Sequence, residues 1–541
     1  MKMNKLFAMA ISATMLLSLT GCQTQQQETT SALTLMNKIN SSTVVDGQKD
    51  MRIWYQIDPA QFTDRYSGTP GTFKTVVQEM NYFSDGNPQD NEADVSMTGI
   101  LLKNVIKVDD SYAVSELTEL NPTIGSDDDL TALCTKANSL NMPVLLTLDL
   151  GSISKNNSQF NAMIQLVSNL KEDEDPYVVD KILADEFFLE KDKEGQDCWT
   201  RIGQTPYYYM SLPNSDIPRI NLDNQVWKQF IINAIEHYFS LGVTGFYIMD
   251  ANNLVPNNEQ KCADFLKWFD SICKERKPES VNLFSYSAWN DPLAEVPMYA
   301  ADLGASGAEG YVAKAATGSI SARELGNLIE QNSVRTQNMT AYFLGHDDGS
   351  MDLLRSEDRI AQYKMTLALE LMLNSQVIIN AGDEIGLTSD QSNFIVSAIE
   401  DDSSSSDDAK NEDSQSEAES DAAKLKFGTV KQQREDGNSI LNFVLQAIRL
   451  RDSYDSITRA NLTVSQELST DQVLVLARYG NDSQTVLVYN LSNTQQEVDL
   501  STVTISGLPA ELGGVLLTGD QEIQLENNKL TLPAYSMALL K

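Results

Sequence analysis

Histidine and cysteine are both scarce in this chain. Only His237 and His346 occur among its 541 residues, so a histidine-rich metal centre is excluded. Two of the five cysteines, Cys262 and Cys273, lie in one predicted helix, about 16 Å apart along its axis and beyond disulfide reach. No CxxC pair is present. We therefore expect neither a disulfide framework nor a zinc site, and no bound metal.

Positive charge is also scarce. The chain has 40 Lys and Arg against 76 Asp and Glu, a net charge of -36 that would repel nucleic acids and anionic lipid headgroups. No nucleic-acid partner is expected. Residues 400–424 carry part of this excess and contain no aromatic or β-branched residue, which predicts an acidic disordered loop. Calcium binding is the alternative for this tract, but it lacks the spacing and glycine turn of a calcium loop.

Long apolar runs are absent beyond the N-terminus. Residues 1–22 begin with Lys2 and Lys5, continue through FAMAISATMLLSL and end in LTGC, the build of a secretory signal. The ending resembles a bacterial lipobox, which implies a lipid on Cys22 and an extracytoplasmic protein anchored to the bacterial cell membrane. An ordinary cleaved signal is the alternative. Residues 23–50, rich in Gln, Ser and Thr, are predicted to be a flexible tether.

What the chain does contain is an alternation of short apolar runs with longer amphipathic ones. This pattern predicts parallel βαβ units and a (β/α)8 barrel over residues 51–150 and 222–460. A doubly wound sheet is the alternative, but no GxGxxG follows the first strand. Residues 151–221 break the pattern and are assigned to a subdomain inserted after strand three. Period-two alternation over residues 461–541 predicts a C-terminal antiparallel β-sandwich. The predicted barrel strands lie at 52–57, 95–102, 143–150, 243–250, 280–286, 339–345 and 375–382.

Two of these runs end abruptly in acidic residues. GVTGFYIMD ends at Asp250, and YFLGHDD contains His346 and Asp347. Acids at the carboxyl end of a buried parallel strand are candidates for chemistry. With NAGDEIGLTS and the closing AYSMALLK, both runs resemble segments of the α-amylase superfamily (glycoside hydrolase family 13). That resemblance implies an α-glucan or oligosaccharide ligand and retaining hydrolysis, which uses a carboxylate nucleophile and an acid about 5 Å apart.

Strand four departs from the family pattern at its catalytic end. The family has a pattern like GFRLDA, with an arginine two residues before the nucleophilic aspartate, whereas this chain reads GFYIMDA. An ungapped alignment puts Tyr247 at the arginine position and Met249 at the nucleophile position. Asp250 then comes one residue late and turns away from the lumen unless a bulge restores it. It is retained as a candidate nucleophile.

Other catalytic positions are also changed. Anchored on Trp289, the alignment places Ser287 at the general-acid position of strand five. In strand three, Thr147 stands at the aspartate position and Gly151 at that of an asparagine that commonly binds the family's structural calcium. A shift of two residues would restore an aspartate, Asp149. We expect no cofactor, although structural calcium is left open.

His346 and Asp347 keep the family pattern. The resemblance assigns Asp347 to transition-state stabilisation and His346 to sugar binding, and a strand-end cap is the alternative. Tyr112, Tyr247 and Trp289 are further candidates for substrate binding. Tyr207, Tyr208 and Tyr209 suit either sugar stacking or a core.

The leading hypothesis is a membrane-anchored protein with an α-amylase-like fold and a degenerate active site, which binds glycan or supports a glycan-uptake system or transporter. Heavy-chain ectodomains of amino-acid transporters, whose strand four also has a late aspartate, are a similar case within the superfamily. The alternative is an active retaining α-glucosidic hydrolase that uses Asp250, with an acid from an unmatched position such as Glu309 or from the inserted subdomain. A third class is a scaffold protein with no sugar site.

Overall fold

The computed structural model describes residues 30–40, 52–63, 70–87, 94–256, 258–286, 299–302, 314–315, 317–335, 340–343, 351–373, 376–399, 425–479, 484–502 and 511–541. The chain divides into residues 1–30 and 31–541, and the second unit contains all the elements below. Cys22, Ser287, Trp289, Glu309, His346, Asp347 and the tract 400–424 lie outside the described residues. None of the described helices is long and apolar enough to span a membrane.

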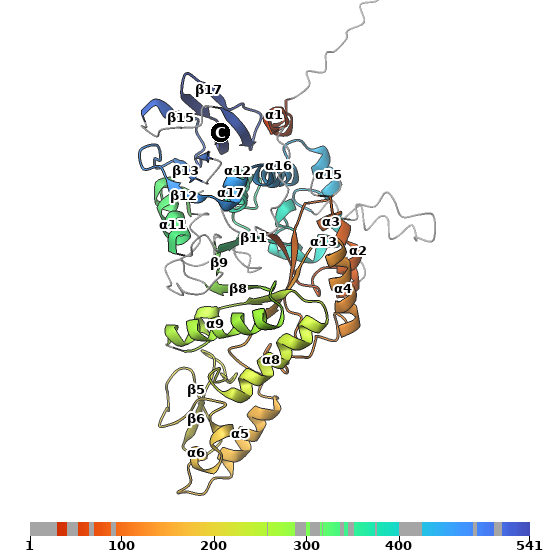
Figure 1. Cartoon of the computed structure of the whole chain (residues 1–541), viewed down its shortest axis with the longest axis vertical. Helices are drawn as coiled ribbons and strands as arrows, with labels where there is room; N and C mark the ends of the chain where they lie inside the picture. Colours follow the sequence, from red (N-terminus) through yellow and green to blue (C-terminus); the bar gives the residue numbers. More distant parts are fainter. Residues whose placement is uncertain are drawn as a thin grey trace, which may run out of the picture. The chain divides into compact units, whose positions relative to one another are not determined.

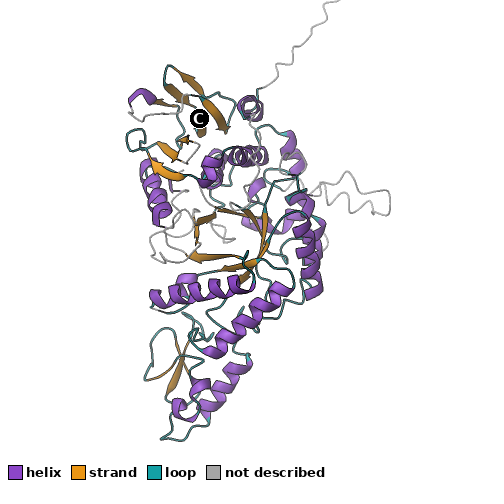
Figure 2. Cartoon of the chain, in the orientation of Figure 1, coloured by secondary structure: helices purple, strands orange, loops and turns teal. Residues whose placement is uncertain are grey.

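Eight parallel strands form a closed barrel (Figure 2) in the order β1-β11-β10-β9-β8-β7-β3-β2. This confirms the predicted fold class. Seven of the strands are predicted by the sequence; the sixth, β9, is not, because its four residues YAAD include two alanines and give little strand signal. The strands are β1 (Ile53–Ile57), β2 (Gly99–Leu102), β3 (Val144–Leu148), β7 (Gly245–Ile248), β8 (Val281–Tyr286), β9 (Tyr299–Asp302), β10 (Thr340–Phe343) and β11 (Gln376–Asn380).

Helices follow or connect the barrel strands (Figure 1), and several begin at a polar cap. In α4, Ser126 and Asp129 form a capping box, and Asn224 and Asn258 cap α8 and α9. These helices and short turns are α2 (Phe73–Gln78), α3 (Met80–Phe83), α4 (Asp127–Ser139), α8 (Gln225–Ser240), η3 (Ala251–Asn253), α9 (Glu259–Arg276), α11 (Ala322–Arg335), α12 (Ile360–Met372), η4 (Asp383–Ile385), η5 (Ser389–Phe394), α13 (Ile395–Ile399), α15 (Val430–Glu435) and α16 (Ile440–Ser453).

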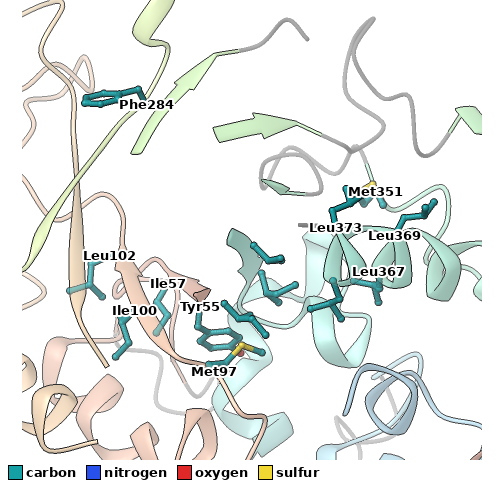
Figure 3. Packing of buried hydrophobic residues seen from close by; sticks show 14 of the residues in the cluster. Tyr55, Ile57, Met97, Ile100, Leu102, Phe284, Met351, Leu367, Leu369 and Leu373 are labelled. Atoms are coloured by element: carbon teal, nitrogen blue, oxygen red, sulfur yellow. The ribbon is translucent and has the colours of Figure 1, made fainter. Parts of the chain in front are cut away.

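The main core lies between the strands and the helices that cover them. Alternate strand side chains join it, including Tyr55 and Ile57 on β1 and Ile100 and Leu102 on β2 (Figure 3). Cys262 and Cys273 lie in the same helix, α9, as predicted, and both are buried.

Residues between β3 and β7 form a small αβ unit. It contains α5 (Ser158–Ser168), α6 (Pro176–Val179), α7 (Lys181–Ala184) and a three-stranded antiparallel sheet of β4 (Leu189–Lys191), β6 (Tyr207–Met210) and β5 (Trp199–Arg201). The side chains of Tyr207, Tyr208 and Tyr209 are at most 7% exposed. The Tyr209 ring packs edge-on against Phe160 of α5, 4.9 Å between centroids. Of the two alternatives for this triplet, the structure favours the core.

The C-terminal region is an antiparallel β domain of two sheets, which follows α17 (Asp455–Arg459) and includes η6 (Leu500–Thr502). The five-stranded sheet has the order β12 (Asn461–Val464), β13 (Val473–Tyr479), β14 (Gln484–Asn490), β19 (Ser536–Leu540), β16 (Leu512–Leu517). The three-stranded sheet has the order β15 (Gln496–Asp499), β18 (Lys529–Leu532), β17 (Gln524–Glu526).

The flexible tether predicted for residues 23–50 needs a correction. Residues Ala32–Ile39 form a helix, α1, capped by Ser31, and its apolar face is buried against β16 and α16. The side-chain amide of Asn40 then pairs with the backbone of Val515 on β16: its Nδ2 donates to the Val515 oxygen and its Oδ1 accepts from the Val515 N–H, each at 2.8 Å. The Gln/Ser/Thr composition concealed this helix because its apolar face needs only Ala32, Leu35 and Met36.

Candidate functional site at the barrel mouth

The lumen of the barrel is filled by a second, separate cluster of apolar side chains. A Cβ atom at Gly99 would lie 2.4 Å from the Trp54 ring, so the glycine makes room for that indole. The indole nitrogen donates to Gln376 Oε1 (2.5 Å). Met249 and Val281 pack partly buried against the cluster. Its buried members are Trp54, Leu101, Leu145, Tyr247, Leu283 and Ile378, from β1, β2, β3, β7, β8 and β11.

The alternation of strands β3 and β7 fixes which side chains face this lumen. Leu145 and Tyr247 belong to the lumen cluster, whereas Leu146 and Phe246 face the helices. Thr147, two residues after Leu145, therefore also faces the lumen, where it pairs in register with Tyr247. The Thr147 hydroxyl forms no hydrogen bond within the described part of the chain.

Strand four of the barrel, β7, thus presents Tyr247 and then Met249 to the lumen. Tyr247 is 2% exposed, and Met249 lies above it, partly buried. Neither side chain is a carboxylate or a cation. Their orientation agrees with the ungapped alignment to GFRLDA.

Asp250 lies beyond the strand in a left-handed turn. Its backbone has φ 45° and ψ 41°, and its carbonyl accepts from the Asn253 N–H (2.8 Å) at the start of η3. Aspartate tolerates this conformation better than most residues, because its short side chain bonds locally. Because Asp250 lies beyond β7 and has a left-handed backbone, strand alternation does not determine the direction of its side chain. That side chain is exposed.

A second carboxylate, Asp149, lies near Asp250. It follows β3 and accepts a hydrogen bond from the Gly151 N–H (3.2 Å). Its side chain reaches solvent but is crowded by protein, and this desolvation raises the pKa of Asp149. The Gly151 bond opposes the shift, and the charge of Asp250 adds to it. The barrel mouth therefore holds two carboxylates, Asp149 and Asp250, which are close enough for the charge of one to affect the pKa of the other.

Arg219 brings a positive charge from the inserted segment to this point. The segment pairs with the chain after β3 through an Arg219–Ser152 bridge, and Arg219 Nη1 donates to the Asn253 oxygen (2.7 Å). Burial lowers the pKa of Arg219, while the negative charge of Asp149 raises it. Arg219 thereby connects the ends of β3 and β7.

The chain matches the family described as "Alpha amylase, catalytic domain" over residues 56–460, and "Alpha-amylase SusG C-terminal domain" over residues 473–537. This chain belongs to the α-amylase family.

Solved structures with the same fold include Eubacterium rectale Amy13B, at 21% identity and a TM-score of 0.77, covering 95% of this chain and 99% of that one. The α-amylase from H. orenii follows at 18% identity and a TM-score of 0.69, covering 91% and 99%. Alpha-amylase 3 of Dictyoglomus thermophilum is 24% identical over 229 residues, 42% of each chain. Trehalose-6-phosphate hydrolase of Escherichia coli is 23% identical over 216 residues, 37% of this chain and 35% of that one. The matched segments thus span less than half of these two relatives.

At the end of β3, Gly151 offers no side-chain ligand at the position where the family pattern has a calcium-binding asparagine, so the residues described there do not reproduce that ligand. No group of three or more metal-binding side chains occurs among the described residues.

Tyr112, a predicted sugar contact, projects into solvent beside this mouth. It is 87% exposed with φ 60° in the loop after β2. Ser154, after β3, donates to Asp109 at the base of the same loop. The Tyr112 ring is therefore free to stack on a ligand.

A polar group at the ends of β1 and β2 was not predicted from the sequence. Asp58 accepts from Asn104 Nδ2 (2.7 Å) and from the Ala60 N–H (3.0 Å). Lys103, two residues after lumen-facing Leu101, has a lowered pKa through burial, opposed by the charges of Asp58 and Asp383. The available signal was the polar pair KN directly after the apolar GILL.

The NAGDEIG turn after β11 is fixed by a buried carboxyl group. Glu384 is fully buried, and its Oε1 accepts from the hydroxyls of Tyr55 and Tyr82, each 2.8 Å. The Gly382 N–H donates to Oε2 (2.9 Å). Burial raises the pKa of Glu384 to about 7, although the tyrosine hydrogen bonds lower it.

This shift predicts that the contribution of Glu384 to stability becomes more favourable on acidification. A carboxyl group whose pKa is raised by folding destabilises the fold above pH 7, and the penalty fades as the pH falls toward 4.5. Glu384→Gln should therefore reduce the difference in unfolding free energy between about pH 8 and 5.5 by about 2 kcal/mol. Urea unfolding at both values measures it. The exposed Glu435→Gln is the control, and an unchanged pH difference in Glu384→Gln would contradict the assignment.

Proposed function

We propose that this member of the α-amylase family binds α-glucan chains at the barrel mouth without hydrolysing them. The observation that carries the proposal is the lumen orientation of Thr147, Tyr247 and Met249. These three side chains occupy the positions at which the family pattern has an aspartate, an arginine and the nucleophile. A thioether forms no glycosyl ester, and retaining hydrolysis needs both a nucleophile and an acid.

The proposal extends to location and partners. A lipid on Cys22 would hold the protein on the outer face of the bacterial cell membrane, where it would pass oligosaccharides to a glycan-uptake system. The lipobox-like LTGC and the apolar run before it support this.

One observation favours a second candidate, an active retaining α-glucosidic hydrolase. Asp149 and Asp250 form a carboxylate pair in which the pKa of Asp149 is raised. A raised pKa suits a general acid, and the exposed Asp250 would be the nucleophile. Asp347 would stabilise the transition state.

One experiment separates these functions. The protein from Gln23 onward is titrated calorimetrically with maltoheptaose, and reducing ends are assayed in parallel for the wild type, Asp149→Asn and Asp250→Asn. Binding without turnover in all three is the expected result. Turnover that either substitution abolishes would establish the hydrolase, and an absence of both binding and turnover would favour the scaffold.

The same titration tests the position of the site. Tyr112→Ala should weaken maltoheptaose binding about tenfold, because stacking of an exposed ring on a sugar is lost. Tyr479→Ala, an exposed tyrosine of β13 in the C-terminal domain, is the matched control. Equal affinities of the two variants would place the glucan elsewhere.

A further inference from the structure

The inserted segment carries a concentration of exposed apolar side chains. Val178 is 84% exposed, Ile182 67%, Val179 51% and Tyr177 37%. We call these four residues, on α6 and α7, the α6–α7 patch. The other large apolar side chains that are exposed in the described part of the chain are scattered: Val108, Tyr112, Val334, Leu353 and Tyr479.

The patch is held in place by its own local structure. Asp175 caps α6 by accepting from the Tyr177 N–H (2.8 Å), and Asp180 caps α7 by accepting from the Leu183 N–H (3.1 Å). Pro176 and Ala184 are buried beneath, and the Tyr177 hydroxyl donates to the Leu189 oxygen of β4 (3.3 Å). Helix α7 contacts both α6 and α5. The exposed valines and isoleucine thus belong to a built surface.

The α6–α7 patch lies within an acidic stretch of the chain, whose exposed carboxylates we call the rim. Residues 171–190 contain eight acidic residues and two lysines, Lys171 and Lys181, a local net charge of -6 (2 minus 8). Glu186 is buried and does not contribute to the exposed rim. The exposed acidic residues are Glu172, Asp173, Asp175, Asp180, Asp185 and Glu190.

We propose that the α6–α7 patch docks a protein partner whose contact surface places apolar side chains inside a ring of lysines and arginines. Exposed apolar patches mark interaction sites, and the acidic rim selects a basic partner. A second copy of this chain would bring the same rim and a net charge of -36. An anionic membrane would be repelled for the same reason. The proposal goes beyond glucan binding and does not depend on it.

The test uses a model of such a partner, an amphipathic helical peptide of leucine and lysine labelled with a fluorophore. Anisotropy measures its binding to the protein from Gln23 onward at about 0.05 and 0.3 M salt. Binding should weaken at the higher salt. The double variant Val178→Ser/Ile182→Ser should bind at least about tenfold more weakly, because two apolar side chains leave the contact.

Three controls keep the result specific. Val334→Ser/Leu353→Ser removes two equally exposed apolar side chains elsewhere and should bind like the wild type. Glu172→Gln/Asp173→Asn should weaken peptide binding mainly at low salt, because it removes two exposed negative charges. Neither residue caps α6 or α7, so the α6–α7 patch should keep its structure. A leucine and glutamate peptide should not bind. Circular dichroism confirms that each variant is folded.

Several results would overturn the proposal. If the patch variant and the Val334→Ser/Leu353→Ser control bound the peptide with equal affinity, the interaction would depend on charge alone. Equal binding of the acidic peptide would remove the role of the rim. Sedimentation that shows a dimer lost in the patch variant would assign the surface to a second copy, and patch-dependent binding to phosphatidylglycerol vesicles would assign it to a membrane. Maltoheptaose binding is unaffected in every case, so failure here leaves the proposed function intact.

Discussion

Replacement of Tyr247 by arginine, the residue that the family pattern has at this position, will lower the free energy of unfolding by about 4 kcal/mol. Tyr247 is 2% exposed among apolar lumen side chains, with Leu145 on the neighbouring strand and Met249 above it. Thr147, its partner in the strand register, carries no charge either. Its register partner on β8, Leu283, is apolar, so the described neighbouring strands place no carboxylate at the level of a guanidinium here.

A second substitution turns this prediction into a test of the degenerate site. In Tyr247→Arg/Met249→Asp the new carboxylate should pair with the arginine and recover about 2 kcal/mol. Tyr247→Phe is the conservative control and should cost no more than about 1 kcal/mol. Urea unfolding of the wild type, Tyr247→Arg, Met249→Asp and the double variant completes the thermodynamic cycle, and Tyr247→Phe is measured beside them. A Tyr247→Arg variant as stable as the wild type would mean that the lumen already supplies a carboxylate or solvent to this position, and would favour the hydrolase.

The fold was largely predictable because its signals repeat. Each barrel strand is an apolar run followed by a helix, and GFYIMD and NAGDEIG are long enough to be placed by resemblance. The orientation of Tyr247 and Met249 followed from strand alternation alone. β9 was missed because two alanines in four residues carry neither a β-branched nor an aromatic signal.

The site was less predictable because its contacts are long-range. Arg219 reaches Asn253 from a segment 34 residues earlier in the chain, and Lys103, after β2, lies near Asp383, after β11, with only β1 between the two strands. Neither pairing leaves a spacing that a single sequence reveals. Asp250 shows a different limit, because its direction depends on a left-handed backbone turn that aspartate permits but does not require.

The α6–α7 patch illustrates a third limit. The sequence PYVVDKIL reads as ordinary core material, and only the fold shows that Pro176 is buried while Val178 faces solvent. Helices α6 and α7 have four residues each, and the apolar side chains on both faces of such short helices are not all buried. Exposure of this kind follows from tertiary packing, which periodicity over so few residues does not encode.

Substitution of Arg451 by methionine will lower the unfolding free energy by about 3–4 kcal/mol. Arg451, on α16, is fully buried, and its Nη1 donates to the carbonyls of Leu371 (2.6 Å) and Leu373 (2.9 Å) at the end of α12. Arg478, on β13, donates to the Met372 carbonyl between them (2.7 Å). The carbonyl end of a helix attracts cations, and without the arginine these carbonyls would be buried and unsatisfied.

Because the two arginines hold three consecutive carbonyls of one helix end, their contributions should not add. The double variant Arg451→Met/Arg478→Met should lose less stability than the two single losses together, since the α12 terminus is already released by the first. Arg449→Met, two residues earlier on α16 and partly exposed, is the control and should change stability by less than about 1 kcal/mol. Urea unfolding of the wild type, the two single variants, the double variant and Arg449→Met measures this. Additive losses would mean that each arginine acts locally; sub-additive losses would mean that the barrel helix and the C-terminal sheet are stabilised as one unit, so that the C-terminal domain cannot be removed without loosening α12.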